Sequence, residues 1–145
     1  MEVHVRTARL TDLDAAVRLM ATRDTDGPAT RADAADILRN LLFVPSATVL
    51  VAEQERRVVG VGVLAIRPSV RGGPFVGVID ELGLATSAPE DASTADALIE
   101  ALAVSARNKG CTRVEVSEPL ATAERSLWER HRFASRGEVL GRSLS

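Results

Sequence analysis

Apolar residues recur at intervals of three and four in three parts of the chain, which predicts three amphipathic helices. A cap signal precedes each of them: Thr11–Asp14, Thr30–Asp33, and Ser93 with Asp96 in the capping-box position. Gly110 is expected to end the third helix. The apolar stripes consist of Leu13, Ala16, Val17 and Met20; of Ala34, Ile37, Leu38 and Leu41; and of Ala95, Leu98, Ile99, Leu102 and Ala106.

Runs rich in β-branched residues predict strands outside these helices. The strands are expected at Val3–Arg6, Thr48–Ala52, Arg57–Ile66, Phe75–Leu84 and Thr112–Val116. Glu53–Arg56 separates the second strand from the third as a hairpin turn, and Arg67–Pro74 is a turn because of its Pro and Gly residues. The third run is apolar without alternation, which is typical of a strand covered on both faces.

The remaining segments complete the predicted fold. Thr122–Arg130 has the pattern of a short helix, and Phe133–Leu144 is expected to give one or two terminal strands. The order contains one hairpin group and one β-α-β crossover. We therefore expect a single domain, residues 1–145, of the α/β (α+β) class. Its sheet should be mixed and mostly antiparallel, with six to seven strands and helices on both faces.

Composition excludes several classes of partner. The 145 residues are 46% hydrophobic and 26% charged, which suits one full core rather than a disordered chain. The net charge of −2, with three Phe, one Trp and no Tyr, argues against a nucleic-acid partner. The longest apolar run, Val58–Ile66, is too short to cross a bilayer, and the charged N-terminus does not resemble a signal peptide. The single cysteine, Cys111, favours a reducing compartment, so we expect a cytoplasmic protein without a membrane partner.

No metal site is expected from the titratable residues. His4 and His131 have no ligand spacing with Cys111. Asp24–Gly27 resembles the start of a calcium loop but lacks the remaining ligands, so we interpret it as a turn.

The order of elements and several local sequences resemble the GCN5-related N-acetyltransferase family. Thr48–Gly62 resembles the family's second and third strands, Ile79–Leu84 its fourth strand, and Ala97–Val116 its central helix and fifth strand. Leu127–Phe133, LWERHRF, lies where the family often has Leu-Tyr-Glu-Lys-x-Gly-Phe. The resemblance covers nearly the whole chain. It implies an acyl-CoA-dependent N-acyltransferase that transfers an acetyl group to a small-molecule or peptide amine, and it allows a homodimer. In the family the segment between the first two helices often covers the acceptor, so Asp24 and Asp26 could attract a cationic amine or could be ordinary loop charges.

The resemblance also implies a place for acetyl-CoA. In the family the pantetheine arm bonds to fourth-strand backbone, and the diphosphate lies on the amides that open the central helix. Unpaired N–H groups and the helix dipole favour an anion there. Carried over to this sequence, the cofactor-binding residues are Leu84, Ser93, Thr94 and Ala95.

The diphosphate loop departs from the family pattern. The family loop reads Arg/Gln-x-x-Gly-x-Gly/Ala, and its positions fall on Glu90 to Ala95, of which only Ala95 fits. Counting from Leu84 instead shifts this alignment by about one residue. The loop has no glycine, arginine or lysine, and Glu90 and Asp91 add negative charge. We therefore expect acetyl-CoA binding to be weak or lost, unless these carboxylates are only solvated loop charges.

Other family positions differ as well. Ala121 lies near the place of an Asn that bonds the pantetheine, and Arg132 replaces the Gly of Gly-Phe. Trp128 replaces the Tyr that protonates the departing thiolate in the family. An indole N–H cannot act as a general acid at a useful pKa. Trp128 is expected in the core or at an interface.

Two carboxylates in the predicted fourth strand, Asp80 and Glu81, are the candidate catalytic residues. They should lie on opposite faces of the strand. One of them could be the general base that deprotonates the amine, directly or through a water. The alternative is a carboxylate paired with an arginine at the end of the sheet. The sequence leaves two functions open: an N-acyltransferase, or a non-catalytic relative that uses the same fold for binding or dimerisation.

Overall fold

A five-stranded sheet organises the chain, with the strand order β1-β2-β3-β4-β5. The computed structural model describes residues 2–20, 31–85 and 92–144. The strands are β1 (His4–Thr7), β2 (Ala47–Gln54), β3 (Arg57–Pro68), β4 (Phe75–Leu84) and β5 (Cys111–Val116). Neighbouring strands are antiparallel, except that β4 and β5 are parallel. The five internal strands predicted from the sequence are confirmed to within a few residues.

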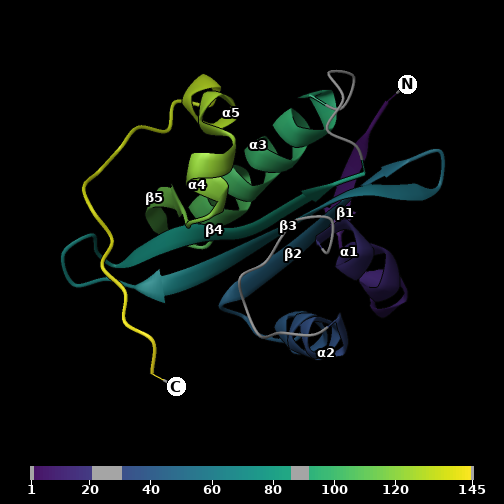
Figure 1. Cartoon of the computed structure of the whole chain (residues 1–145), viewed down its shortest axis with the longest axis horizontal. Helices are drawn as coiled ribbons and strands as arrows, with labels where there is room; N and C mark the ends of the chain where they lie inside the picture. The colour runs from purple at the N-terminus through teal and green to yellow at the C-terminus, as the bar shows by residue number, and fades with distance from the viewer. Residues whose placement is uncertain (1, 21–30, 86–91, 145) are drawn as a thin grey trace.

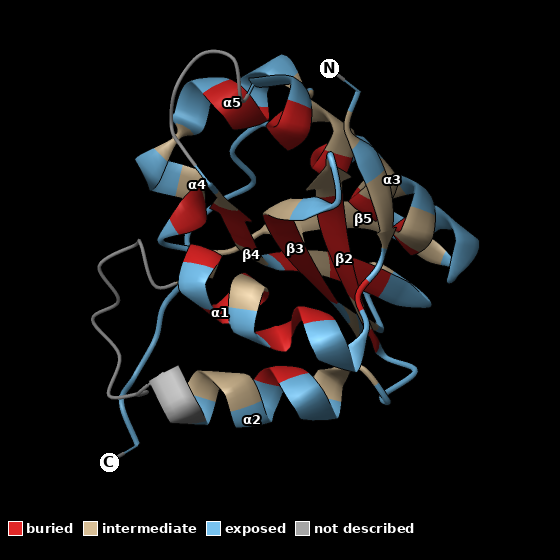
Figure 2. Ribbon diagram, turned by 90° about the vertical axis from the view of Figure 1, so that its right-hand side faces the viewer, coloured by how far each residue is buried: buried red, intermediate tan, exposed pale blue. Residues whose placement is uncertain are grey.

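Helices cover both faces of this sheet (Figures 1 and 2). They are α1 (Leu13–Met20), which follows a short 3₁₀ helix (Leu10–Asp12), α2 (Arg31–Leu41), α3 (Ala92–Asn108), α4 (Leu120–Ala123) and α5 (Arg125–Arg130). α1 and α2 lie on one face, and α3, α4 and α5 lie on the other. The predicted helix Thr122–Arg130 is therefore two short helices. None of the helices in the described ranges has the length and apolarity that a membrane span requires.

The core consists of two apolar clusters, one on each face of the sheet. β3 contributes to both, as predicted for a strand covered on both faces: Val61 and Val63 face α1, and Leu64 faces α3. The predicted stripe of α3 is buried in full and anchors the second cluster. Gly110, with φ of +88°, follows this helix in the left-handed conformation that favours glycine.

A partly buried ion-pair network joins β1, β2 and the start of α1. Arg6 Nη1 lies 2.7 Å from Asp12 Oδ2, and Arg6 Nη2 lies 3.0 Å from Glu53 Oε2. Asp12 also accepts the backbone N–H of Arg9 at 2.7 Å, so its carboxylate caps the 3₁₀ helix, one turn before the position predicted from Thr11–Asp14. The Arg6 guanidinium holds the pKa of Asp12 below its usual value.

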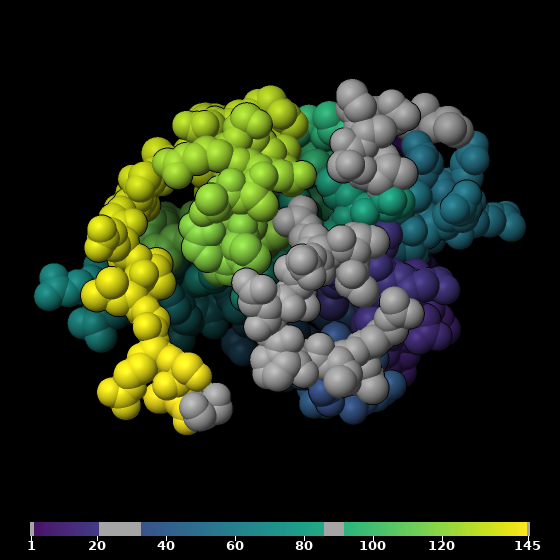
Figure 3. Space-filling model, in the orientation of Figure 1, coloured from purple at the N-terminus to yellow at the C-terminus, as the bar shows by residue number. Residues whose placement is uncertain are grey.

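Two fold predictions are wrong. Phe133–Leu144 forms no strand, so the sheet has five strands rather than six or seven. The end of the chain runs down the outside of the molecule (Figure 3), and Val139, Leu140 and Leu144 are each about nine-tenths exposed. Ile37 is the second correction, because it is 56% exposed while its neighbour Leu38 is buried.

Candidate active site where the fourth and fifth strands part

The pairing of β4 with β5 stops halfway along β4. The two strands pair from Phe75↔Cys111 to Ile79↔Val116, and the last link is the Ser117 N–H, which donates to the Ile79 carbonyl at 3.1 Å. β4 continues to Leu84, where it pairs with Gly60 of β3. In the described part of the chain, the Asp80–Leu84 half of β4 thus has a strand on one side only. On the other side, no described strand pairs with this half of β4.

A β-bulge lies where the two halves of β4 meet. Ile79 is opposite Leu64 and Glu81 is opposite Val63, so Asp80 has no partner residue on β3. Ile79 and Leu82 belong to the same core cluster although they are three residues apart. The prediction that Asp80 and Glu81 lie on opposite faces assumed strict alternation, and the bulge breaks it.

Asp80 and Glu81 differ in their surroundings. Asp80 is exposed, and the Ser117 hydroxyl donates a long hydrogen bond of 3.5 Å to its Oδ1. No arginine or lysine lies within ion-pair distance of Asp80 among the described residues. Glu81 is half-buried beside it. The ion-paired alternative for this strand therefore does not apply to Asp80 within the ranges that the structure describes.

The end of α1 packs directly against this half of β4. A Cβ added to Gly83 would lie 2.9 Å from the backbone carbon and oxygen of Leu19 and 3.2 Å from the backbone nitrogen of Met20. Only glycine allows this approach, because a side chain would meet the backbone of α1. The helix therefore ends beside the candidate site. Asp24 and Asp26, proposed from the sequence to face an amine, lie outside the described residues.

The start of α3 lies over the end of β4. Leu84 pairs with Gly60, and a Cβ at Gly60 would lie 3.1 Å from Thr94 Cγ2. Thr94 and Ala95 are only 3% and 2% exposed, so their side chains pack on the sheet, whereas Ser93 is exposed. Of the predicted cofactor-binding residues, Thr94 and Ala95 can offer a ligand only their backbone amides. Glu90 and Asp91 lie outside the described residues.

Trp128 belongs to the core and not to the reacting groups. It is 3% exposed, its Nε1–H donates to the Leu120 carbonyl at 2.9 Å, and its ring meets Phe133 edge-on at 5.3 Å. The prediction of a core position is confirmed. Because the indole N–H is already bonded, it has no proton to offer a leaving group.

This architecture is shared with solved acetyltransferase structures. The aminoglycoside N-acetyltransferase AAC(6')-Iy, solved in complex with CoA, has a TM-score of 0.82 at 17% identity, over 98% of this chain and 94% of that chain. The chain has the fold of the GCN5-related N-acetyltransferases. The ribosomal-protein-alanine N-acetyltransferase from Brucella melitensis biovar Abortus 2308 has a TM-score of 0.75 at 18% identity, over 99% and 100% of the two chains.

These comparisons show that the proteins share a fold, and not that they share a function. A transcriptional regulator from Bacillus halodurans C-125 has a TM-score of 0.80 at 15% identity, over 99% of this chain and 100% of that one. No family model matches the sequence, and a comparison with curated proteins finds no significant match. Function must therefore be argued from the site itself.

In this fold, the Asp96 carboxylate links α5 to the first turns of α3 through ion pairs. Arg130 Nη2 and His131 Nε2 each lie 2.7 Å from Asp96 Oδ1, and His131 Nδ1 lies 3.5 Å from Glu100 Oε2. Burial raises the pKa of Asp96, but its bonds to Arg130 and His131 bring it below the usual value. The predicted capping-box role is wrong, because α3 begins at Ala92 and the Asp96 carboxylate is engaged by α5.

Sequence reasoning missed two residues of the site, Ser117 and Gly83. Ser117 directly follows β5, and only the β4–β5 alignment brings it to the bulge. Gly83 gave a weak signal, since glycine inside a strand often marks a close backbone approach. In the described ranges no three His, Cys, Asp or Glu side chains come together as a metal site would require.

Proposed function

We propose that this chain is an acyl-CoA-dependent N-acyltransferase that transfers an acetyl group to an amine. The observation that carries the proposal is the half of β4 from Asp80 to Leu84, which lacks a β5 partner and ends beneath the start of α3. A strand edge that no described strand covers suits the amide groups of a pantetheine arm, and the amides that open α3 suit a diphosphate. Thr94 and Ala95 would contribute backbone N–H groups, and Leu84 the end of the strand.

Asp80 or Glu81 is the proposed general base. The base takes a proton from the ammonium group, directly or through a water, so that the amine nitrogen can attack the thioester carbonyl; the nitrogen loses its second proton to water as the tetrahedral intermediate collapses. Backbone N–H groups of β4 polarise that carbonyl, and holding the two reactants together supplies much of the rate. The C–S bond then breaks, and the thiolate takes a proton from water or from a group not yet identified. Trp128 is not that group.

The proposed acceptor is a small-molecule or peptide amine. Asp80 is an exposed carboxylate without a cationic partner among the described residues, and it would favour a positively charged acceptor. We propose that acetyl-CoA itself binds weakly, since no basic side chain occurs in the loop before α3.

Calorimetry with acetyl-CoA and CoA, together with a thiol-release assay over a panel of amines, tests this function. We expect binding weaker than the low micromolar range, with a dissociation constant of about 10⁻⁵ M or more, and transfer to at least one amine. Low micromolar or tighter binding would show that the interpretation of the loop is wrong. If neither binding nor transfer occurs with the folded protein, the non-catalytic alternative is the better one.

We also propose a homodimer, in the cytoplasm. Among the described residues β5 pairs only with β4, so its outer edge is open. The end of the chain exposes the apolar side chains of Val139, Leu140 and Leu144, and their exposure to water is unfavourable. In a dimer, residues 134–144 of each copy would pair along β5 of the other copy. This pairing would cover both the open edge of β5 and the exposed apolar side chains. Light scattering should give the molar mass of a dimer for the whole protein and that of a monomer for a variant that lacks residues 134–145. A monomer in both cases would refute this assembly.

A further inference from the structure

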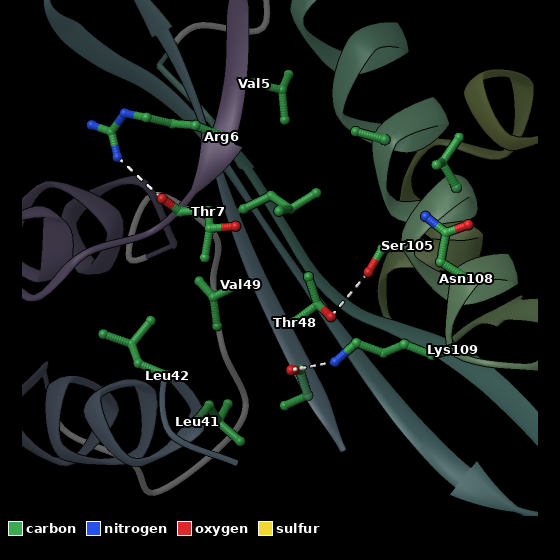
Figure 4. A pocket seen from close by; sticks show the side chains of 14 residues that line it. Val5, Arg6, Thr7, Leu41, Leu42, Thr48, Val49, Ser105, Asn108 and Lys109 are labelled. Atoms are coloured by element: carbon green, nitrogen blue, oxygen red, sulfur yellow. Dashed lines mark hydrogen bonds between the residues drawn. The ribbon is translucent and has the colours of Figure 1, made fainter. Parts of the chain in front are cut away.

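A groove lies at the far end of α3, away from the proposed active site. It is a groove of about 580 Å³ between the end of α2 and the last turns of α3 (Figure 4). The groove exists because β1 is shorter than β2. Their pairing ends at Thr7↔Leu50, so β2 extends beyond it from Ala47 to Val49. Lys109 follows α3, so at 1.5 Å per residue it lies about 25 Å along the helix from Ala92.

Polar groups gather on the α3 side of the groove. Ser105 Oγ and Thr48 Oγ1 lie 3.1 Å apart, and Asn108 lines the same wall. Lys109 Nζ donates to the Pro45 carbonyl at 2.9 Å and to the Ala47 carbonyl at 3.3 Å. An ammonium group has three N–H donors, so one remains for a ligand.

Lys109 has no acidic partner among the described residues. No carboxylate lines the groove, and Lys109 has no carboxylate at ion-pair distance in the part of the chain that the structure describes. The other cation of the lining, Arg6, is already paired with Asp12 and Glu53. Figure 4 shows its guanidinium turned away from Lys109. The groove therefore offers one unpaired positive charge.

The opposite wall is apolar. Leu41 and Leu42 at the end of α2, with Val49 of β2, face Lys109 and Asn108 across the groove. The volume lies within the range of small-molecule sites, about 300–1,000 Å³. The Lys109 ammonium, the Asn108 amide and the two hydroxyls can balance the charge and fill the hydrogen bonds of a single carboxylate. A phosphate monoester would need more positive charge.

We propose that this groove binds a small amphipathic monocarboxylate, such as a medium-chain aliphatic acid. Its carboxylate lies at Lys109, Asn108 and Ser105, and its hydrocarbon part lies on Leu41 and Leu42. The site is separate from the acyl-transfer site and does not depend on the proposed function.

Octanoate, 1-octanol and octylammonium are suitable probes, because they share a chain and differ in charge. By titration calorimetry of the whole protein we expect octanoate to bind and octylammonium to bind at least about fivefold more weakly, as expected when one charge contact is reversed. Lys109→Gln should weaken octanoate by about fivefold and leave octanol unchanged. Arg107→Gln is the matched control: it removes a neighbouring charge of α3 that does not line the groove, so octanoate affinity should not change.

Val104→Glu keeps the proposal testable if Lys109→Gln fails to fold. Val104 lines the groove and is 52% exposed, so the fold should tolerate the substitution. The new carboxylate would repel octanoate and should lower its affinity about fivefold. The proposal is overturned if octanoate does not bind. It is equally overturned if octanoate and octylammonium bind alike, or if neither Lys109→Gln nor Val104→Glu weakens octanoate. Lys109 would then only cover the open edge of β2.

Discussion

The two halves of β4 have different neighbours, although the sequence of the strand runs on without a break. From Phe75 to Ile79 the strand is held by β3 and β5, and the facing carboxylate, Glu115, lies between Arg67 and Arg113. From Asp80 to Leu84 it pairs, among the described strands, with β3 only, and α1 packs on Gly83. Asp80 there has no arginine or lysine partner among the described residues. One half is therefore fixed by strands and ion pairs on both sides, and the other is the place of the proposed chemistry.

The largest expected effect tests the chemistry of the second half. Glu81→Gln should lower the acylation rate at neutral pH by about 10²-fold or more, the usual scale for loss of a general base. Asp80→Asn is the paired variant, and comparing the two decides which carboxylate is the base. Initial rates at saturating acetyl-CoA give the measurement. If both variants acylate amines at the parental rate, neither carboxylate is the base.

Matched glycine substitutions test how each half is held. Gly83→Ala places a Cβ against the backbone of α1, and overpacking of this kind should cost about 2–3 kcal/mol in the free energy of unfolding. Gly77→Ala, in the paired half, meets the side chains of Ala106 and Leu64 at 3.2 Å, which can shift, so we expect about 1 kcal/mol. Urea denaturation measures both. A smaller cost at Gly83 than at Gly77 would contradict the close contact with α1.

The diphosphate loop gives the next test. Glu90→Arg, Asp91→Gly and Ser93→Gly together should raise CoA affinity about tenfold to a hundredfold, because two carboxylates are removed and one arginine is added. The gain should shrink at high salt. Calorimetry of parent and variant at two ionic strengths measures it. No gain at either salt, with the fold intact by circular dichroism, would indicate a closed site.

The smallest effect belongs to the paired half. Burial raises the pKa of Glu115, but its bonds to Arg113 and Arg67 lower it further, so the net value is below the usual one. Its contribution to stability is therefore present above the unfolded pKa, about 4.3, and is lost as pH falls through the folded pKa.

Glu115→Gln should accordingly cost at most about 1 kcal/mol at neutral pH and flatten the loss of stability in acid. Unfolding by urea at a series of pH values provides the measurement. Asp80→Asn is the control, and it should change stability by less than about 0.5 kcal/mol. Equal pH dependence in parent and Glu115→Gln would show that the arginine pairs contribute nothing.

Much of the fold could be predicted because it rests on local patterns. The β-branched run Phe75–Leu84 and the stripe of α3 are set by residues close in sequence. The bulge at Asp80 could not be predicted, because it depends on which residue of β3 lies opposite. The same holds for Asp96, whose partners Arg130 and His131 are more than thirty residues away. Phe133–Leu144 has strand-like residues, but whether it pairs with a strand edge depends on contacts distant in sequence, which a local pattern does not specify.

The site was predictable in outline only. The resemblance indicated the β4 carboxylates and the start of α3, yet burial of Thr94 and Ala95 restricts them to backbone contacts. The groove beside Lys109 had no sequence signal, since it arises from the different lengths of β1 and β2.

Backbone amide chemical shifts during a CoA titration test the central claim most directly. With ¹⁵N-labelled protein, we expect the amides of Asp80–Leu84 and those at the start of α3 to shift as CoA is added. The amides of Phe75–Ile79, already paired with β5, should stay in place. Shifts confined to other parts of the molecule, or equal shifts along both halves of β4, would contradict the claim that the half of this strand beyond β5 binds the acyl donor.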